Sequence, residues 1–232
     1  MSKKQQPSPQ PTERRLKILV SSTVYGYEEM LESIYALLGT YGYEVLMSHK
    51  GTIPVDPDES AMKSCLDAVR DCDIFLGLIL PSYGSGKELP DGLSITHREL
   101  IESIALNKPR WFLVHEHVAV ARQLLDPYRR KVERNGRKQA VSPFEFQAGI
   151  QFQRTPILSD PRVIDMFELA MRHDITEVKD RRGNWVQQYG PEDDARLFGT
   201  AQFRRYRDLA EKYLPKLKEI QSITNQIKGG AN

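Results

Sequence analysis

Four short apolar runs mark the first half of the chain, and amphipathic segments separate them. The runs are nearly continuous in hydrophobic residues, which is typical of strands buried on both faces: LKILV (16–20), YEVLM (43–47), IFLGLIL (74–80) and RWFLV (110–114). Between them, apolar residues recur at helical spacing. This predicts a helix ending at Gly39 or Gly42, a second from about Ala61 to Asp71, and a third within SITHRELIESIALNKP (94–109).

This alternation implies parallel strands joined by right-handed crossovers, with helices on both faces. We therefore expect an α/β protein with a flavodoxin-like, doubly wound parallel sheet. The opening SKKQQPSPQPTERR is typical of a disordered tail, so we place residues 1–15 outside an α/β domain spanning 16–160. Residues 161–232 are expected to form a helical, aromatic-rich C-terminal extension, which either packs on the domain or mediates oligomerisation.

Beyond Val114 the pattern is less regular. It predicts helices at about 118–134 and 161–173, with a basic turn, RNGRK, after the first. A fifth strand is expected within Ser142–Leu158, around PFEFQ, and RRGNWVQQYGPEDD (181–194) is expected to be an ordered aromatic loop. The last helix, about 200–228, carries a heptad-like seam that packs on its own domain or forms a dimer contact. Pro215 should kink or divide it.

Composition and charge narrow the functional class. The net charge of +2 does not argue for nucleic-acid binding, and the longest apolar run is far below the roughly 20 residues of a membrane helix. We expect no signal segment, because residues 1–15 are polar rather than charged and then apolar. Cys65 and Cys72 are interpreted as reduced, buried thiols. We therefore expect a cytoplasmic protein without membrane or nucleic-acid partners.

The carboxyl ends of the predicted strands carry polar, glycine-rich loops. In a flavodoxin-like sheet the first and third strands flank the point where the strand order reverses, and ligands bind there. The loops SSTVYGY (21–27) and PSYGSGKELPDGLSIT (81–96) should therefore face one another across a crevice. Neither a GxGxxG nor a GxxxxGK[ST] motif occurs, so a standard Rossmann cofactor site and a P-loop are not expected.

Two groups of residues in these loops are candidates for binding. Ser21, Ser22 and Thr23 offer hydroxyls and amides that suit a ribose or phosphate at a helix start, although Ser22 or Thr23 would equally serve as a helix cap. Tyr83 can stack on a ring of the ligand. The further candidate binding residues are Tyr25, Ser94 and Thr96.

Glu99 is the strongest catalytic candidate. The spacing Thr96-His-Arg-Glu99 fits a capping box, in which the glutamate bonds back to the helix start. The same position points the carboxylate into the predicted crevice. A carboxylate there can stabilise or attack an oxocarbenium-like sugar, as in glycosyl transfer.

Other chemistries have weaker support. His97, His115 and His117 are too few and too loosely spaced for a closed zinc signature, although HEH would place both of its histidines on one strand face. No GxSxG elbow of a serine hydrolase is present. We therefore expect no metal.

Residues 16–118 resemble the TIR-like proteins, and most closely a bacterial branch of unknown function whose first strand reads VFVSST. The resemblance is carried by LKILVSSTVYGY, the strand ending in PSYG, and SITHRELIESIALNKP. It implies cleavage of the nicotinamide–ribose bond of NAD, with the position of Glu99 catalytic and NAD as substrate, so that no separate cofactor is required. It further implies a role in antiphage defence or signalling, with self-association through the 48–56 loop and an effector protein or signal nucleotide as a further partner.

An NAD glycohydrolase or cyclase is therefore the leading hypothesis. Nicotinamide leaves as a neutral base, so one well-placed carboxylate suffices. A non-enzymatic TIR-like assembly or adaptor module is the first alternative. A nucleoside deoxyribosyltransferase-like N-glycosidase, with a similar sheet and a nucleophilic glutamate, is the second.

Overall fold

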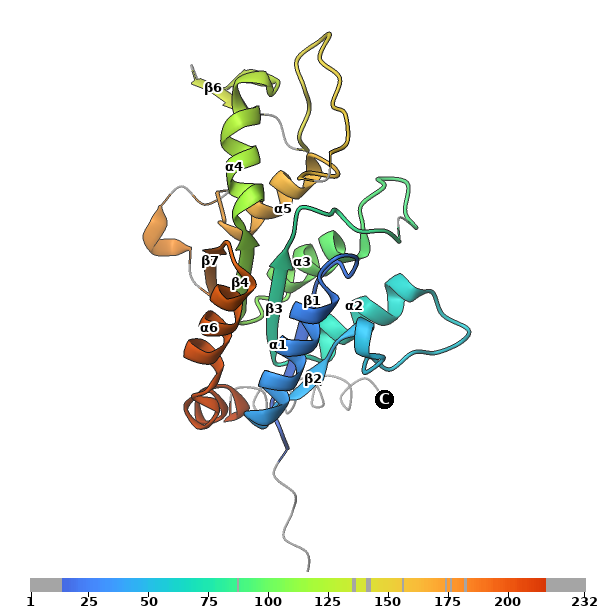
Figure 1. Ribbon diagram of the computed structural model, residues 1–232, viewed down its shortest axis with the longest axis vertical. Helices are drawn as coiled ribbons and strands as arrows, with labels where there is room; N and C mark the ends of the chain where they lie inside the picture. Colours follow the sequence, from blue (N-terminus) through green and yellow to red (C-terminus); the bar gives the residue numbers. More distant parts are fainter. Residues whose placement is uncertain are drawn as a thin grey trace, which may run out of the picture.

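Five parallel strands form the central sheet of the protein, in the order β2-β1-β3-β4-β7 (Figure 1). The computed structural model describes residues 14–215, except 87, 135–136, 141–142, 156, 174, 176 and 182. The predicted tail lies outside the described residues up to position 13. The strands are β1 (Lys17–Ser21), β2 (Glu44–Leu46), β3 (Ile74–Ile79), β4 (Arg110–His115) and β7 (Asn184–Tyr189). The flavodoxin-like doubly wound order is confirmed.

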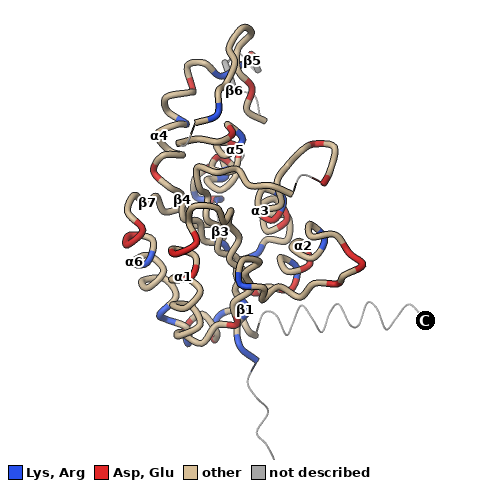
Figure 2. The backbone as a smooth tube through the Cα atoms, turned by 45° about the vertical axis from the view of Figure 1, so that its right-hand side comes forward, with Lys and Arg blue, Asp and Glu red and all other residues tan. Residues whose placement is uncertain are grey.

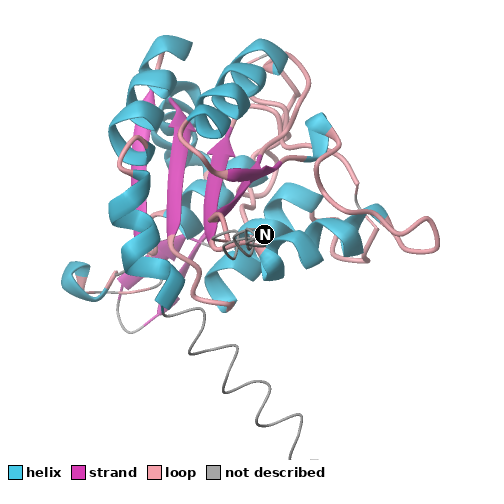
Figure 3. Cartoon of the chain, turned by 90° about the horizontal axis from the view of Figure 1, so that it is seen from below, coloured by secondary structure: helices cyan, strands magenta, loops and turns pink. Residues whose placement is uncertain are grey.

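Helices cover both faces of the sheet (Figure 3). One face packs against α1 (Glu28–Thr40), α6 (Glu192–Phe203) and the helical residues 206–215. The other packs against α2 (Ala61–Asp71), α3 (Ile95–Ala105), α4 (Glu116–Leu125) and α5 (Arg162–Ala170). The two hydrophobic cores follow from the strand pattern, because alternate residues of each buried strand point to opposite faces.

The remaining elements are short and lie outside the main sheet. A two-stranded antiparallel hairpin, β5 (Lys131–Arg134) with β6 (Arg137–Ala140), projects beyond α4 (Figure 1). Three single 3₁₀ turns complete the described elements: η1 (Ser48–Lys50), η2 (Asp126–Tyr128) and η3 (Val178–Asp180).

The second half of the chain departs from the sequence prediction. The fifth strand is not within 142–158, where Phe146 makes only an isolated bridge to Arg129. It is β7, in the segment predicted to be a loop, and it pairs with β4 over its full length. Because β7 is an edge strand in which Gln187 and Gln188 are exposed, its hydrophobic signal is weak. The sheet therefore extends past residue 160.

The helix predicted at 118–134 is also shorter than expected. α4 ends at Leu125, and the chain continues through η2 into β5. Pro127 explains the break, because proline lacks the amide hydrogen that a continuing helix needs and its ring clashes with the preceding turn.

The C-terminal extension packs on the domain through its described part. Phe203 and Leu209 are buried in the core beside α1, and Tyr206, Ala210 and Tyr213 pack against that core. The helix breaks at residues 204–205, earlier than the break expected at Pro215. The predicted seam from Leu217 onward lies outside the described residues.

Acidic and basic residues are not segregated into separate parts of the fold. Figure 2 shows acidic and basic residues interspersed along the chain, in line with the net charge of +2. In the described part of the protein, no helix combines the length and the apolar character needed to cross a membrane.

Gly77 provides a test of packing at the centre of the sheet. A Cβ at this position would lie 2.6 Å from the ring of Phe112 and 3.0 Å from that of Phe75, both fully buried. Gly77→Ala should therefore lower the free energy of unfolding by about 1–3 kcal/mol, measured by urea denaturation. Gly39→Ala, in α1 with no atom within 4 Å of the new methyl group, should be neutral or slightly stabilising. Equal effects of the two substitutions would contradict this packing.

Candidate active site

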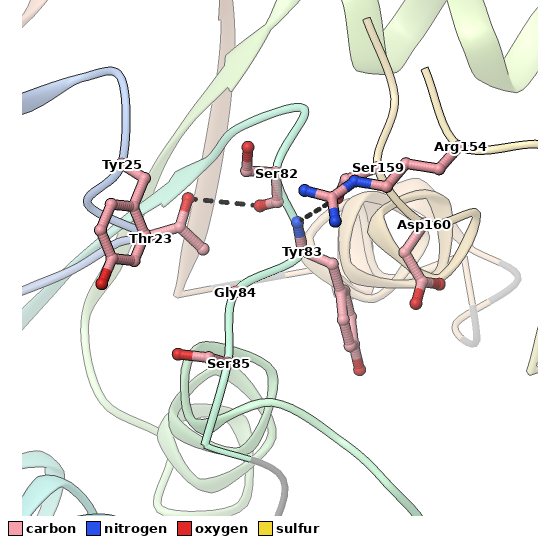
Figure 4. Close-up of a pocket in the computed structure, with 9 residues that line it drawn as sticks. All are labelled: Thr23, Tyr25, Ser82, Tyr83, Gly84, Ser85, Arg154, Ser159 and Asp160. Carbon is pink, nitrogen blue, oxygen red and sulfur yellow. Dashed lines mark hydrogen bonds between the residues drawn. The ribbon is translucent and has the colours of Figure 1, made fainter. Parts of the chain in front are cut away.

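A polar cavity of about 360 Å³ lies where the loops after β1 and β3 meet. This is the switch point of the sheet, where β1 is flanked by β2 on one side and β3 on the other. The two loops face one another there, as the strand order predicts. A third wall comes from the segment before α5 (Figure 4). The lining residues are Thr23, Tyr25, Ser82, Tyr83, Gly84, Ser85, Arg154, Ser159 and Asp160.

Glu99 lies on α3 with its carboxyl group buried. The hydroxyl of Ser21, at the carboxyl end of β1, donates a hydrogen bond of 2.5 Å to Glu99 Oε2. Only 4% of Glu99 is exposed, and none of the described residues forms an ion pair with it. Burial raises the pKa of Glu99 to about 7, although hydrogen bonds from Ser21 and Cys65 act in the opposite direction. The carboxyl group is therefore close to half ionised at neutral pH.

Glu99 does not belong to a capping box. The N-cap of α3 is Ser94, whose hydroxyl accepts a hydrogen bond from the amide of His97. His97 thus occupies the position three residues after the cap, and Glu99 lies beyond it in the second turn. The expected role of Thr96 as cap is wrong because the helix begins two residues earlier. Helix capping therefore does not explain the buried carboxyl group of Glu99.

The layer between the cavity and the helix that carries Glu99 is formed by Gly84 and Thr96. Thr23 and Gly84 line the cavity, and a Cβ at Gly84 would lie 2.7 Å from Thr23 Cγ2 and 3.7 Å from Thr96 Oγ1. Thr96 precedes Glu99 by three residues and therefore shares its face of α3. The positive φ of Gly84, 86°, and its missing side chain allow the loops to approach this closely. Neither Glu99 nor Ser21 lines the cavity in this closed arrangement.

Tyr83 is not available to stack on a ligand, contrary to expectation. Its side chain is only 2% exposed, and its hydroxyl lies 2.8 Å from His97 Nδ1. The guanidinium of Arg162 covers the ring, 4.4 Å from the centroid. Burial raises the pKa of Tyr83 and lowers that of His97 to about 4, so both side chains are neutral at pH 7. This group braces the loop after β3.

Of the residues in the first loop that were expected to bind a ligand, only some line the cavity. Thr23 and Tyr25 line the cavity, and Tyr25 is 83% exposed. Ser22 donates its hydroxyl to the carbonyl of Thr23 and does not line the cavity. None of these residues caps α1, because that helix begins only at Glu28, after Tyr27. The expected helix-start phosphate site is therefore absent from this loop.

The third wall was missed by sequence reasoning. Arg154, Ser159 and Asp160 come from a segment far from the two loops in sequence. Ser159 reaches them directly, since its hydroxyl accepts a hydrogen bond of 2.8 Å from the amide of Tyr83. The available signal was the triplet SDP immediately before a helical pattern, which marks a helix start and hence the edge of the sheet.

The histidines do not form a metal site. His115 ends β4 and acts as the N-cap of α4, its Nδ1 accepting a hydrogen bond from the amide of His117. The HEH pattern predicts that both side chains lie on one strand face. This prediction is wrong, because His117 belongs to α4 and not to β4. Within the described residues, no group of three or more His, Cys, Asp or Glu side chains is placed to hold a metal ion. Cys65 and Cys72 are free, buried thiols, as expected.

A second cavity, of about 370 Å³, lies at the opposite edge of the sheet, beside the amino ends of β4 and β7. Its lining includes Trp111, Trp185 and Tyr213. Ligands of doubly wound sheets bind at the carboxyl edge, so the cavity beside Glu99 is the stronger candidate.

The raised pKa of Glu99 has a measurable effect on stability. The folded protein holds this proton more tightly than the unfolded chain, whose glutamate has the ordinary value near 4.5. Stability contributed by the protonated carboxyl is therefore full below pH 4.5 and is lost as the pH rises to about 7. Since one pKa unit corresponds to about 1.4 kcal/mol, the loss amounts to roughly 3 kcal/mol.

Glu99→Gln removes this titration. The stability difference between the variant and the wild type should therefore shift in favour of the variant by roughly 3 kcal/mol between pH 4.5 and 8, measured by urea denaturation. Glu102→Gln, on the same helix but paired with Arg70 at the surface, is the matched control and should show little shift. A pH-independent difference for Glu99→Gln would contradict the inferred pKa.

Comparison with known proteins identifies the family. Among curated proteins, none matches the chain. A CMP N-glycosidase of Clostridium botulinum, BcmB, is 21% identical with a TM-score of 0.31, over 47% of this chain and 79% of that one. A 2-deoxyribosyltransferase of Bacillus psychrosaccharolyticus is 23% identical with a TM-score of 0.29, over 42% of this chain and 72% of that one. A family model matches residues 17–167, more than half of the chain, which therefore belongs to the family described as domain of unknown function DUF4062.

Proposed function

We propose that this protein cleaves the N-glycosidic bond of a nucleoside or nucleotide, with Glu99 as the catalytic carboxylate. The observation that carries the proposal is a buried carboxyl group with a pKa of about 7 and no cationic partner among the described residues, one layer from a polar cavity at the switch point. Strongly perturbed acids beside a cavity are candidates for catalysis. The TIR-like resemblance of residues 16–118 points to the same side chain.

The arrangement supports a definite division of roles. As the bond between the sugar C1′ and the base nitrogen breaks, positive charge develops on the sugar, and ionised Glu99 would stabilise it or attack C1′. The base departs with the electron pair of that bond and takes up a proton from solvent. Water then adds at C1′, displaces the Glu99 carboxylate where that has attacked, and releases a proton, so that free base and free sugar result. Ser21 would orient the carboxylate through the bond to Oε2 and keep part of it ionised.

Access to Glu99 requires the layer above it to move. The loop carrying Gly84 would have to shift away from Thr96 before a sugar can reach the carboxylate. Closure over a bound sugar would exclude water and strengthen the electrostatic stabilisation.

The size of the cavity favours a small substrate. About 360 Å³ lies at the low end of the range for small-molecule sites, which suits a single nucleoside or nucleotide better than a dinucleotide. Cleavage of NAD, the narrower hypothesis, therefore becomes one arm of the test. A role in defence or signalling remains part of that narrower hypothesis.

The decisive experiment measures release of free base. Purified protein is incubated with nucleosides, nucleoside 5′-monophosphates and NAD, and the products are separated by chromatography. Glu99→Gln should reduce base release on the order of 10²–10⁴-fold, while Glu102→Gln, the control on the same helix, retains activity. Undiminished release by folded Glu99→Gln would refute the role of Glu99. Absence of release from every substrate would instead favour a non-enzymatic binding module.

The pH dependence distinguishes the role of the carboxylate. If the ionised form acts, the rate should rise with pH through about 7. Ser21→Ala removes a hydrogen bond that lowers the pKa of Glu99, so the rising limb of the profile should move to higher pH. An unmoved limb would show that Ser21 does not set the ionisation of the catalytic group.

A further inference from the structure

Arg154 presents a cation to the cavity, and none of the acidic side chains among the described residues pairs with it. Its side chain points into the cavity from the third wall, towards Ser82 (Figure 4). Within the described part of the chain, the Arg154 guanidinium makes no ion pair or hydrogen bond. A planar guanidinium offers five N–H donors whose geometry matches a phosphate.

The neighbouring carboxylate does not account for Arg154. Asp160 also lines the cavity, but Arg162 binds it through Nε at 3.0 and 3.1 Å and through Nη2 at 2.6 Å. The same guanidinium donates to the carbonyl of Gly92 and covers the ring of Tyr83. Arg162 is thus held within the protein and largely neutralises the charge of Asp160. The positive charge of Arg154 is therefore not offset, and the cavity is left with a net positive charge.

Two serine hydroxyls line the same cavity as Arg154. The hydroxyl of Ser82 makes no hydrogen bond within the described residues. Ser159 uses its oxygen to accept from the amide of Tyr83, which leaves its own hydrogen for a ligand. A guanidinium with two adjacent hydroxyl donors is a fitting environment for a phosphate dianion.

We propose that Arg154, with the hydroxyls of Ser82 and Ser159, binds the 5′-phosphate of a nucleoside monophosphate. The inference rests on the proposed function, because it names the substrate class of the same site. Thr23 and Gly84 mark the side of the cavity towards Glu99, and Arg154 comes from the opposite wall (Figure 4). One sugar can therefore present C1′ to the carboxylate while its 5′-phosphate is held at the far wall.

Affinity measurements test the phosphate site independently of catalysis. Dissociation constants for a nucleoside 5′-monophosphate and its matching nucleoside are measured by calorimetry for each base. In the wild type the monophosphate should bind more tightly than the nucleoside. Arg154→Gln should reduce this preference about ten- to hundred-fold, as expected for loss of a charged hydrogen bond, and Arg154→Lys should restore part of it.

Arg196→Gln is the matched control for the loss of one positive charge. Arg196 is an exposed arginine on α6, near Asp193 and outside the cavity lining, so its substitution should leave the preference unchanged. An equal loss in Arg196→Gln, or a preference that survives Arg154→Gln, overturns the inference. Arg154-dependent binding of NAD without binding of monophosphates overturns the assignment to monophosphates.

The two proposals fail in different ways. Glu99→Gln should keep the preference for the monophosphate even where it abolishes base release. If no substrate is cleaved but the preference depends on Arg154, the phosphate site stands and the catalytic function is refuted. If base release depends on Glu99 but nucleosides and monophosphates bind equally, the catalytic function stands and the phosphate site is refuted.

Discussion

Parallel pairing of the five strands is the constraint on which the site depends. Parallel strands place every carboxyl end at one edge of the sheet, so the loops after β1 and β3 must meet there. The pairing of Ser21 with Gly77 sets the register at that edge. Because the sheet is covered on both faces, Ser21 and Glu99 are almost completely withdrawn from water. The hydrogen bond between Ser21 and Glu99 is a direct product of this arrangement.

The buried acid is informative because no structural explanation accounts for it. Ser94 caps α3, so Glu99 does not contribute to the helix start. Without a cation beside it among the described residues, Glu99 is destabilising when ionised, and burial opposes that ionisation. Proteins accept such costs most readily at functional sites, where a perturbed acid has a chemical use.

The two arginines of the third wall show how position decides the use of a side chain. Arg162 lies at the start of α5, where it holds Asp160 and covers Tyr83, and so it braces the cavity. Arg154 lies in the preceding segment and makes no such contact with the described residues. The first is part of the framework of the cavity, and the second lines the cavity with a guanidinium that no described residue binds.

The four buried strands, the three helices between them and the sheet edge of the candidate site could be predicted from the amino-acid sequence, because continuous apolar runs and helical periodicity are local signals. The sequence also singled out Glu99 and Ser21. It did not identify β7, whose exposed polar residues hide an edge strand. The burial of Tyr83 and the position of Arg154 in the cavity lining became evident only from the folded chain. Contacts between segments far apart in the chain produce no periodic pattern of hydrophobic residues in the sequence, so they can be recognised only in the folded protein.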